Sequence, residues 1–160
     1  MTGIRRGRQM AQIEGDFVVF IIGYRPTWAR LQHTWGDLGG RRGMFRMLKE
    51  LSDNPESGLL GYERSTFGGI IIQYWRSFDH LERFANDNSD LHVAAWRDYW
   101  RRVGTEEGTG IWHETYLVRA GEYEAVYANM PPFGLGKVST LVPYDQVSAR
   151  QRLGAARSTR

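Results

Sequence analysis

The chain of 160 residues contains no cysteine. This absence excludes disulfide bonds, thiolate zinc sites, iron–sulfur clusters and cysteine nucleophiles. Long apolar runs are also missing, since none approaches the ~18 residues of a membrane-spanning helix. Arginines near the N-terminus resemble the start of an export signal, but the next apolar run, Phe17 to Ile22, is short and lies behind Glu14 and Asp16. We therefore expect a cytoplasmic protein with no membrane contact.

Most of the chain carries no net charge. The formal net charge is +3, and residues 145–160 carry four arginines against one aspartate, which accounts for all of it. Residues 1–144 are therefore neutral overall, and no basic face interleaved with aromatic residues is visible. We expect residues 145–160 to be a disordered basic tail, and we expect no nucleic-acid partner.

Apolar and aromatic residues, by contrast, are abundant. The composition is 41% hydrophobic and 24% charged, which is typical of a globular chain long enough to bury a core. Six tryptophans, eight tyrosines and seven phenylalanines suit a core or a pocket with large flat surfaces. We predict a flexible N-terminal arm over residues 1–14 and one folded domain over residues 15–144, with no internal repeat.

The order of sequence patterns predicts an α+β fold. The expected elements are a buried strand at 16–23, a helix from Asp37 or Arg41 to about Leu51, a hairpin of strands 59–66 and 70–76, helices capped by Ser77 and Ser89, a strand at 110–118 and a strand-like segment at 123–127. This β-α-β-β-α-β order is that of the ferredoxin-like fold, whose antiparallel sheet carries helices on one face only. A second copy is the simplest cover for the other face, so we expect a homodimer that forms an α+β barrel.

Two of the four histidines are candidate ligands. His113 should share a face of strand 110–118 with Ile111 and Thr115, and we expect that strand to be central and the imidazole to be buried. A buried imidazole is either a satisfied core residue or a metal ligand held by a second-shell acceptor, and the residues alone leave both readings open. His92 lies one helical turn before Trp96, and it is either a core-edge residue or a ligand.

A loop rich in proline and glycine, from Asn129 to Gly136, follows the strand of His113. We interpret the two together as a site with a lid. Familiar catalytic patterns are absent: the sequence has no G-x-S-x-G, no H-E-x-x-H and no P-loop. The Gly134-Leu135-Gly136 segment lacks the third glycine of a dinucleotide-binding fingerprint.

The passage from Ile72 to Phe84 resembles the "Y-W-R-S-x-x-x-L-E" passage of the dimeric α+β-barrel superfamily. Within that superfamily, residues 16–142 resemble a small monooxygenase-like family that includes a fumagillin-pathway protein. The resemblance implies the same ferredoxin-like barrel, and it leaves the chemistry open because one fold hosts many functions.

The chain is also similar to the haem-containing aldoxime dehydratases. Their "Y-H-E-V" strand corresponds to Trp112-His113-Glu114-Thr115, and their "F-E-Y-x-N-C-H" segment corresponds to the stretch from Tyr123 to about Pro131. The first histidine of the dehydratases is the proximal haem ligand, so the resemblance implies haem b bound through His113. Their second histidine is the distal catalytic group, and here Pro131 stands near that position, so the implied similarity covers haem binding rather than aldoxime dehydration. The chain is about half as long as a dehydratase.

Other branches of the superfamily imply alternatives. Haem-degrading monooxygenases take their iron ligand from a helix near the position of His92, and a third branch oxidises quinol precursors without a cofactor. Our first hypothesis is a haem enzyme, monooxygenase- or aldoxime-dehydratase-like, acting on a small organic substrate such as a nitrogen-containing secondary metabolite. The alternatives are a cofactor-independent monooxygenase of aromatic or quinol substrates and a non-catalytic dimer that binds a small ligand. The residues expected to line the substrate pocket are Trp75, Asn129, Met130 and Phe133.

Overall fold

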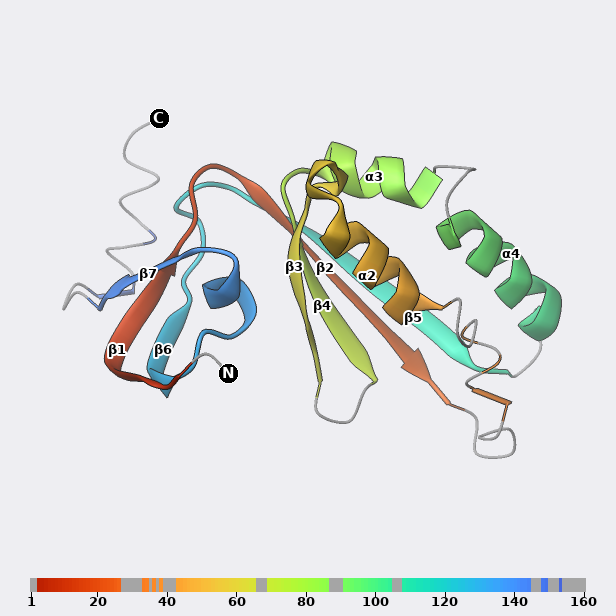
Figure 1. Ribbon diagram of the computed structural model, residues 1–160, viewed down its shortest axis with the longest axis horizontal. Helices are drawn as coiled ribbons and strands as arrows, with labels where there is room; N and C mark the ends of the chain where they lie inside the picture. The colour runs from red at the N-terminus through yellow and green to blue at the C-terminus, as the bar shows by residue number, and fades with distance from the viewer. Residues whose placement is uncertain are drawn as a thin grey trace.

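The computed structural model contains two antiparallel sheets and a layer of helices (Figure 1). It describes residues 3–26, 33–34, 36, 38, 43–65, 69–86, 91–104, 108–144, 148–149 and 153. The elements are β1 (Arg5–Gln12), β2 (Phe17–Arg25), α2 (Met44–Asp53), η3 (Pro55–Ser57), β3 (Leu59–Arg64), β4 (Ile70–Trp75), α3 (Phe78–Asn86), α4 (Leu91–Val103), β5 (Gly110–Val118), β6 (Val126–Met130), η4 (Gly134–Lys137) and β7 (Thr140–Pro143).

The larger sheet has the strand order β3-β4-β2-β5, with every neighbouring pair antiparallel. With α2 between β2 and β3, and α3 and α4 between β4 and β5, this is the predicted ferredoxin-like arrangement, and the α+β fold class is confirmed. The continuous apolar run of β2 is explained by its place between two strands, where both of its faces carry packed side chains.

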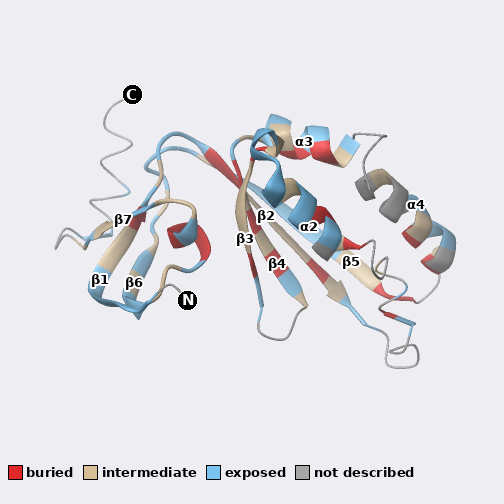
Figure 2. Ribbon diagram, in the orientation of Figure 1, coloured by how far each residue is buried: buried red, intermediate tan, exposed pale blue. Residues whose placement is uncertain are grey.

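The helices cover one face of this sheet, here called the helix face. Its core contains Val18, Trp75 and Phe84, with Met47 from α2 and Leu81 from α3. In this core the rings of Trp75 and Phe84 stack with their centroids 5.6 Å apart. Figure 2 shows buried residues on β2 and β4 beside the helices, whereas most of β1 and β6 is intermediate or exposed.

The helix boundaries follow the predicted signals in part. Ser77 caps α3 as predicted, since its hydroxyl accepts a hydrogen bond from the backbone N–H of His80 and contacts the ring of that histidine. Helix α2 begins at Met44, after the N-cap Gly43, which is later than either predicted start. The predicted cap Ser89 lies outside the described residues. No helix in the described part of the chain is long and apolar enough to cross a membrane.

Residues 5–12 differ from the predicted loose arm, because they form β1, the middle strand of a second sheet with the order β6-β1-β7. Strand β7 was not predicted, and β6 begins three residues later than the predicted start at Tyr123. The physical reason is a second core between the two sheets, which contains Ala11, Phe17 and Leu135. Burial of these side chains compensates for the ordering of a polar N-terminal strand.

Strand β5 occupies a different place from the one predicted. It pairs with β2 along all nine of its residues, and it is the outer strand of the four that make up the described sheet. The prediction that the strand of His113 is central is therefore wrong. Ferredoxin-like connectivity places the last strand at the edge, and Trp112 to Leu117 are exposed on both faces.

Candidate functional site

The helix face of β5 carries His113. In the register of the sheet, His113 stands opposite Ile22, while Thr115 and Leu117 stand opposite Phe20 and Val18. Residues directly opposite each other in an antiparallel pair point to the same side of the sheet. Because Val18 belongs to the core beneath the helices, His113 projects toward the helix face as well.

The imidazole of His113 is exposed, not buried as predicted. Its ring lies against the ring of Phe20, with centroids 5.3 Å apart and an interplanar angle of 33°. Within the described residues, neither ring nitrogen has a hydrogen-bond partner. Among the described elements, helix α2 makes its sheet contacts mainly with β3, and helix α3 with β4.

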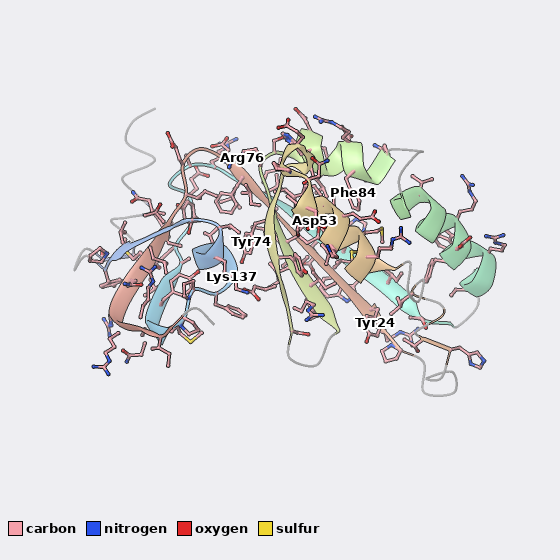
Figure 3. All side chains as sticks on the ribbon, in the orientation of Figure 1. Tyr24, Asp53, Tyr74, Arg76, Phe84 and Lys137 are labelled. Atoms are coloured by element: carbon pink, nitrogen blue, oxygen red, sulfur yellow. The ribbon has the colours of Figure 1, made fainter. Side chains whose placement is uncertain are left out.

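The opposite face of the sheet, here called the open face, is covered at one end by η4. The Glu63 carboxylate accepts a hydrogen bond of 3.0 Å from the backbone N–H of Gly134. It also forms an ion pair with the Lys137 ammonium, at 2.5 Å. Glu63 is 8% exposed, so these two donors satisfy a carboxylate that would otherwise be costly to bury. In Figure 3 the labelled Tyr74 and Lys137 lie together beside η4.

Two tyrosines complete this polar cluster. The Tyr127 hydroxyl accepts a hydrogen bond of 2.9 Å from the backbone N–H of Gly136. A Cβ on Gly134 would stand 3.0 Å from the Tyr74 hydroxyl, in a backbone conformation with φ +56° that favours glycine. Burial raises the pKa of Tyr74 above 10.0, and the nearby Tyr127 raises it further. Burial likewise raises the pKa of Tyr127. Both phenols are therefore neutral at physiological pH and act as hydrogen-bonding groups.

The predicted lid does not lie over His113 within one chain. The η4 turn packs on the open face through Glu63 and Tyr74, whereas His113 projects from the helix face. The sheet itself separates the loop from the histidine. The prediction was wrong because the loop was placed by its position in the sequence, without the second sheet that carries it to the other side.

Three of the residues predicted to line a pocket have structural contacts of their own. Trp75 is 0% exposed in the core, where its indole N–H donates a 2.9 Å hydrogen bond to Gln73. Asn129 adopts φ 51°, and its side chain accepts a 2.9 Å hydrogen bond from the backbone N–H of Gly7 at the bulge of β1. Phe133 is 45% exposed and lies beside the Lys137 ammonium, which is 5.8 Å from its ring centroid.

The remaining two predicted site residues lie elsewhere. Met130 is 41% exposed and pairs with Arg5 in the second sheet. The backbone of His92 lies in the first turn of α4, and its side chain is outside the described part of the structure. The structure thus does not gather the predicted pocket residues around His113.

The sequence interpretation missed the cluster of Glu63, Tyr74, Tyr127 and Lys137. One signal was available, since alternation within β3 and β4 places Glu63 and Tyr74 on the same face as the apolar residue Ile72. The residues that the structure describes contain no group of three or more His, Asp or Glu side chains that could hold a metal ion. A cofactor that needs one protein ligand would fit the exposed imidazole of His113.

Comparison with known proteins agrees with this fold. Residues 17–135 match the family described as "Monooxygenase af470-like". The chain is 26% identical over 159 residues to "Monooxygenase af470" of Aspergillus fumigatus, covering 86% of this chain and 56% of that protein. The chain thus spans about half the length of this relative.

Two solved aldoxime dehydratases have a similar structure. One, OxdRE in complex with butyraldoxime, has a TM-score of 0.63 at 19% identity, over 84% of this chain and 41% of the dehydratase. The other has a TM-score of 0.64 at 18% identity, over 88% and 43% of the two chains. These similarities show a shared fold, as the motif resemblance implied. The family match covers most of the chain, which therefore belongs to the Monooxygenase af470-like family.

Proposed function

We propose that the protein is a haem-binding enzyme, monooxygenase- or aldoxime-dehydratase-like, in which His113 is the axial ligand. The observation that carries the proposal is the exposed imidazole of His113, whose ring nitrogens have no hydrogen-bond partner among the described residues. An exposed imidazole with no hydrogen-bond partner among the described residues can donate its lone pair to iron.

The surroundings of His113 fit the proximal side of a haem. Phe20 and Ile22 on β2, with Leu117 on β5, give this side of the sheet an apolar surface, and Leu117 is 69% exposed. A flat, largely apolar macrocycle would cover such a surface and remove it from water. A bound haem supplies a redox-active iron whose reactivity depends on the axial ligand and on the groups across from it.

The Asn129 to Gly136 loop of the same chain packs on the open face, so other groups would have to line the far side of a haem bound by His113. We propose that helix α4 or a second copy of the chain supplies them. The hydroxyl of Tyr99 on α4 donates a 2.7 Å hydrogen bond to the carbonyl of Thr109, which fixes α4 beside the start of β5. His92, in the first turn of α4, remains the second candidate ligand.

We further propose a homodimer that acts on a small organic substrate, with nitrogen-containing secondary metabolites as the compound class. On the open face, Trp112, Tyr116 and Ile70 are 40%, 50% and 39% exposed. A second copy would bury these side chains, and two copies together would approach the length of the similar relatives, of which this chain covers 41–56%.

A cofactor-independent monooxygenase is the second candidate, because the family is described as monooxygenase-like. In such an enzyme the substrate itself reacts with oxygen, while side chains such as Trp112 position it. Oxygen consumption by the haem-free protein with a quinol substrate would support this candidate.

Haem titration tests the first proposal. Wild-type protein and the variants His113→Ala and His92→Ala would be mixed with haem, and the Soret band of the bound form would be recorded. We expect a red-shifted band in the wild type and in His92→Ala, and its loss in His113→Ala. A wild-type protein that gives only the spectrum of free haem would contradict the proposal. Loss of the band in His92→Ala alone would transfer the ligand role to that residue.

A further inference from the structure

Among the described residues, the ring contact recorded for the proposed ligand His113 is with Phe20. The two residues are diagonal neighbours, since Phe20 stands opposite Thr115 and His113 stands opposite Ile22. Diagonal neighbours on paired strands are within reach of each other when their side chains are aromatic. The ring centroids lie 5.3 Å apart, within the range of favourable aromatic contacts.

Phe20 also packs against the core beneath the helices. Its side chain is partly buried and packs against the helix-face core, which includes Val18, Met47 and Trp75. Phe20 therefore contacts both the helix-face core and the exposed imidazole. Close packing in such a core restricts a side chain to one rotamer.

A histidine that binds a metal is usually oriented by a hydrogen bond from its other ring nitrogen to a carboxylate, a carbonyl or a water. No residue in the described part of the chain accepts such a bond from His113. Among the described residues, the contact with the Phe20 ring is the one recorded that can orient this imidazole.

We propose that Phe20 is a positioning residue that fixes the ring orientation of His113 and connects it to the helix-face core. Any effect of Phe20 on a bound haem rests on the proposed function. The ring contact and its effect on the orientation of His113 are independent of that function, because they exist in the protein without a cofactor.

The test is proton NMR on the haem-free protein. The ring signals of His113 are assigned by their loss in His113→Ala. We expect nuclear Overhauser effects between the two rings in the wild type, and ring-current-shifted His113 signals. In Phe20→Leu those signals should move to the positions of an unstructured histidine, and in Phe20→Tyr, which keeps an aromatic ring, they should stay.

Phe84→Leu is the matched control, because Phe84 lies in the same core, stacked on Trp75. It removes the same volume from the core, and we expect it to leave the His113 signals in place. The proposal is overturned if the wild type shows no Overhauser effect between the two rings, a measurement that needs no variant. It is also overturned if Phe84→Leu shifts the His113 signals as far as Phe20→Leu does.

The same variants separate this inference from the proposed function. If haem binds, Phe20→Leu should broaden the electron paramagnetic resonance signal of the ferric form, while Phe84→Leu leaves it sharp. Absence of haem binding by the wild type would remove the proposed function, whereas absence of the ring contact in the haem-free protein would remove only the role of Phe20.

Discussion

The two faces of the larger sheet are built in opposite ways. Under the helices, apolar side chains such as Trp75 and Phe84 make a closed core, and the exposed edge of that face holds an imidazole without a hydrogen-bond partner in the described chain. Against the open face, Glu63 of β3 and Tyr127 of β6 each accept a hydrogen bond from the backbone of η4, and Glu63 also pairs with Lys137. A polar group that is already satisfied supports structure, while an accessible one is available to a ligand. This difference is the basis for proposing a ligand role for His113 and a structural role for the Glu63 cluster.

The largest effect on stability should come from the helix face. Trp75→Ala removes a fully buried ring and leaves the side-chain oxygen of Gln73 without its 2.9 Å donor. We expect a loss of about 3–5 kcal/mol in the free energy of unfolding, measured by urea denaturation. A loss below about 1 kcal/mol would show that this core does not hold the sheet and the helices together.

On the open face, Glu63→Ala should cost less. The change leaves the Gly134 N–H without an acceptor in a buried position, while Lys137, whose side chain is 47% exposed, can turn to solvent. We expect a loss of about 2 kcal/mol in urea denaturation. Glu63→Gln is the control, with a smaller expected loss because its amide oxygen can still accept the Gly134 hydrogen bond and no buried charge is left unpaired. Equal losses in the two variants would contradict the structural role of that hydrogen bond.

The contact between Gly23 and Trp112 offers a double-mutant cycle on the uncovered part of the open face. A Cβ at Gly23 would lie 2.7 Å from the indole ring of Trp112. We expect Gly23→Ala to cost about 1 kcal/mol, because the half-exposed ring can partly move away. The cost should fall when Trp112→Ala is also present. Strict additivity of the two changes would show that the ring does not lie on Gly23.

The smallest expected effect is a change in how stability depends on alkaline pH. Because the folded pKa values of Tyr74 and Tyr127 are raised, the unfolded chain loses these protons first as the pH rises. Stability is therefore retained below about pH 10 and falls between the ordinary tyrosine pKa and the higher folded values. The double variant Tyr74→Phe/Tyr127→Phe should show a shallower fall in the urea midpoint over this range. An unchanged slope would indicate that these phenols titrate normally in the folded protein.

Much of the fold was predictable from local patterns. The apolar run of β2, the Ser77 cap and the hairpin of β3 and β4 each carry their own signal, and together they specify a ferredoxin-like order. Strand β1 could not be predicted in this way. Its arginines are typical of a solvated segment, and the strands that pair with it, β6 and β7, lie near the other end of the sequence. The local sequence of β1 does not reveal partners that lie so far along the chain, because strand formation depends strongly on context.

Of the candidate site, only His113 could be predicted from the sequence. His113 was selected by its strand and by the resemblance, but its exposure depends on β5 lying at the sheet edge. The side of the sheet that the Asn129 to Gly136 loop occupies depends on the second sheet, and the buried position of Glu63 depends on η4. Neither is a property of the local sequence, so the predicted lid was placed on the wrong face.

Cavity rescue of His113 tests the assignment of the axial ligand most directly. The variant His113→Gly removes the imidazole at an exposed strand position, so the fold should persist. We predict that His113→Gly mixed with haem lacks the wild-type Soret band and that added imidazole restores it, since free imidazole can occupy the vacated position. A His113→Gly variant that keeps the wild-type spectrum without imidazole would contradict the account.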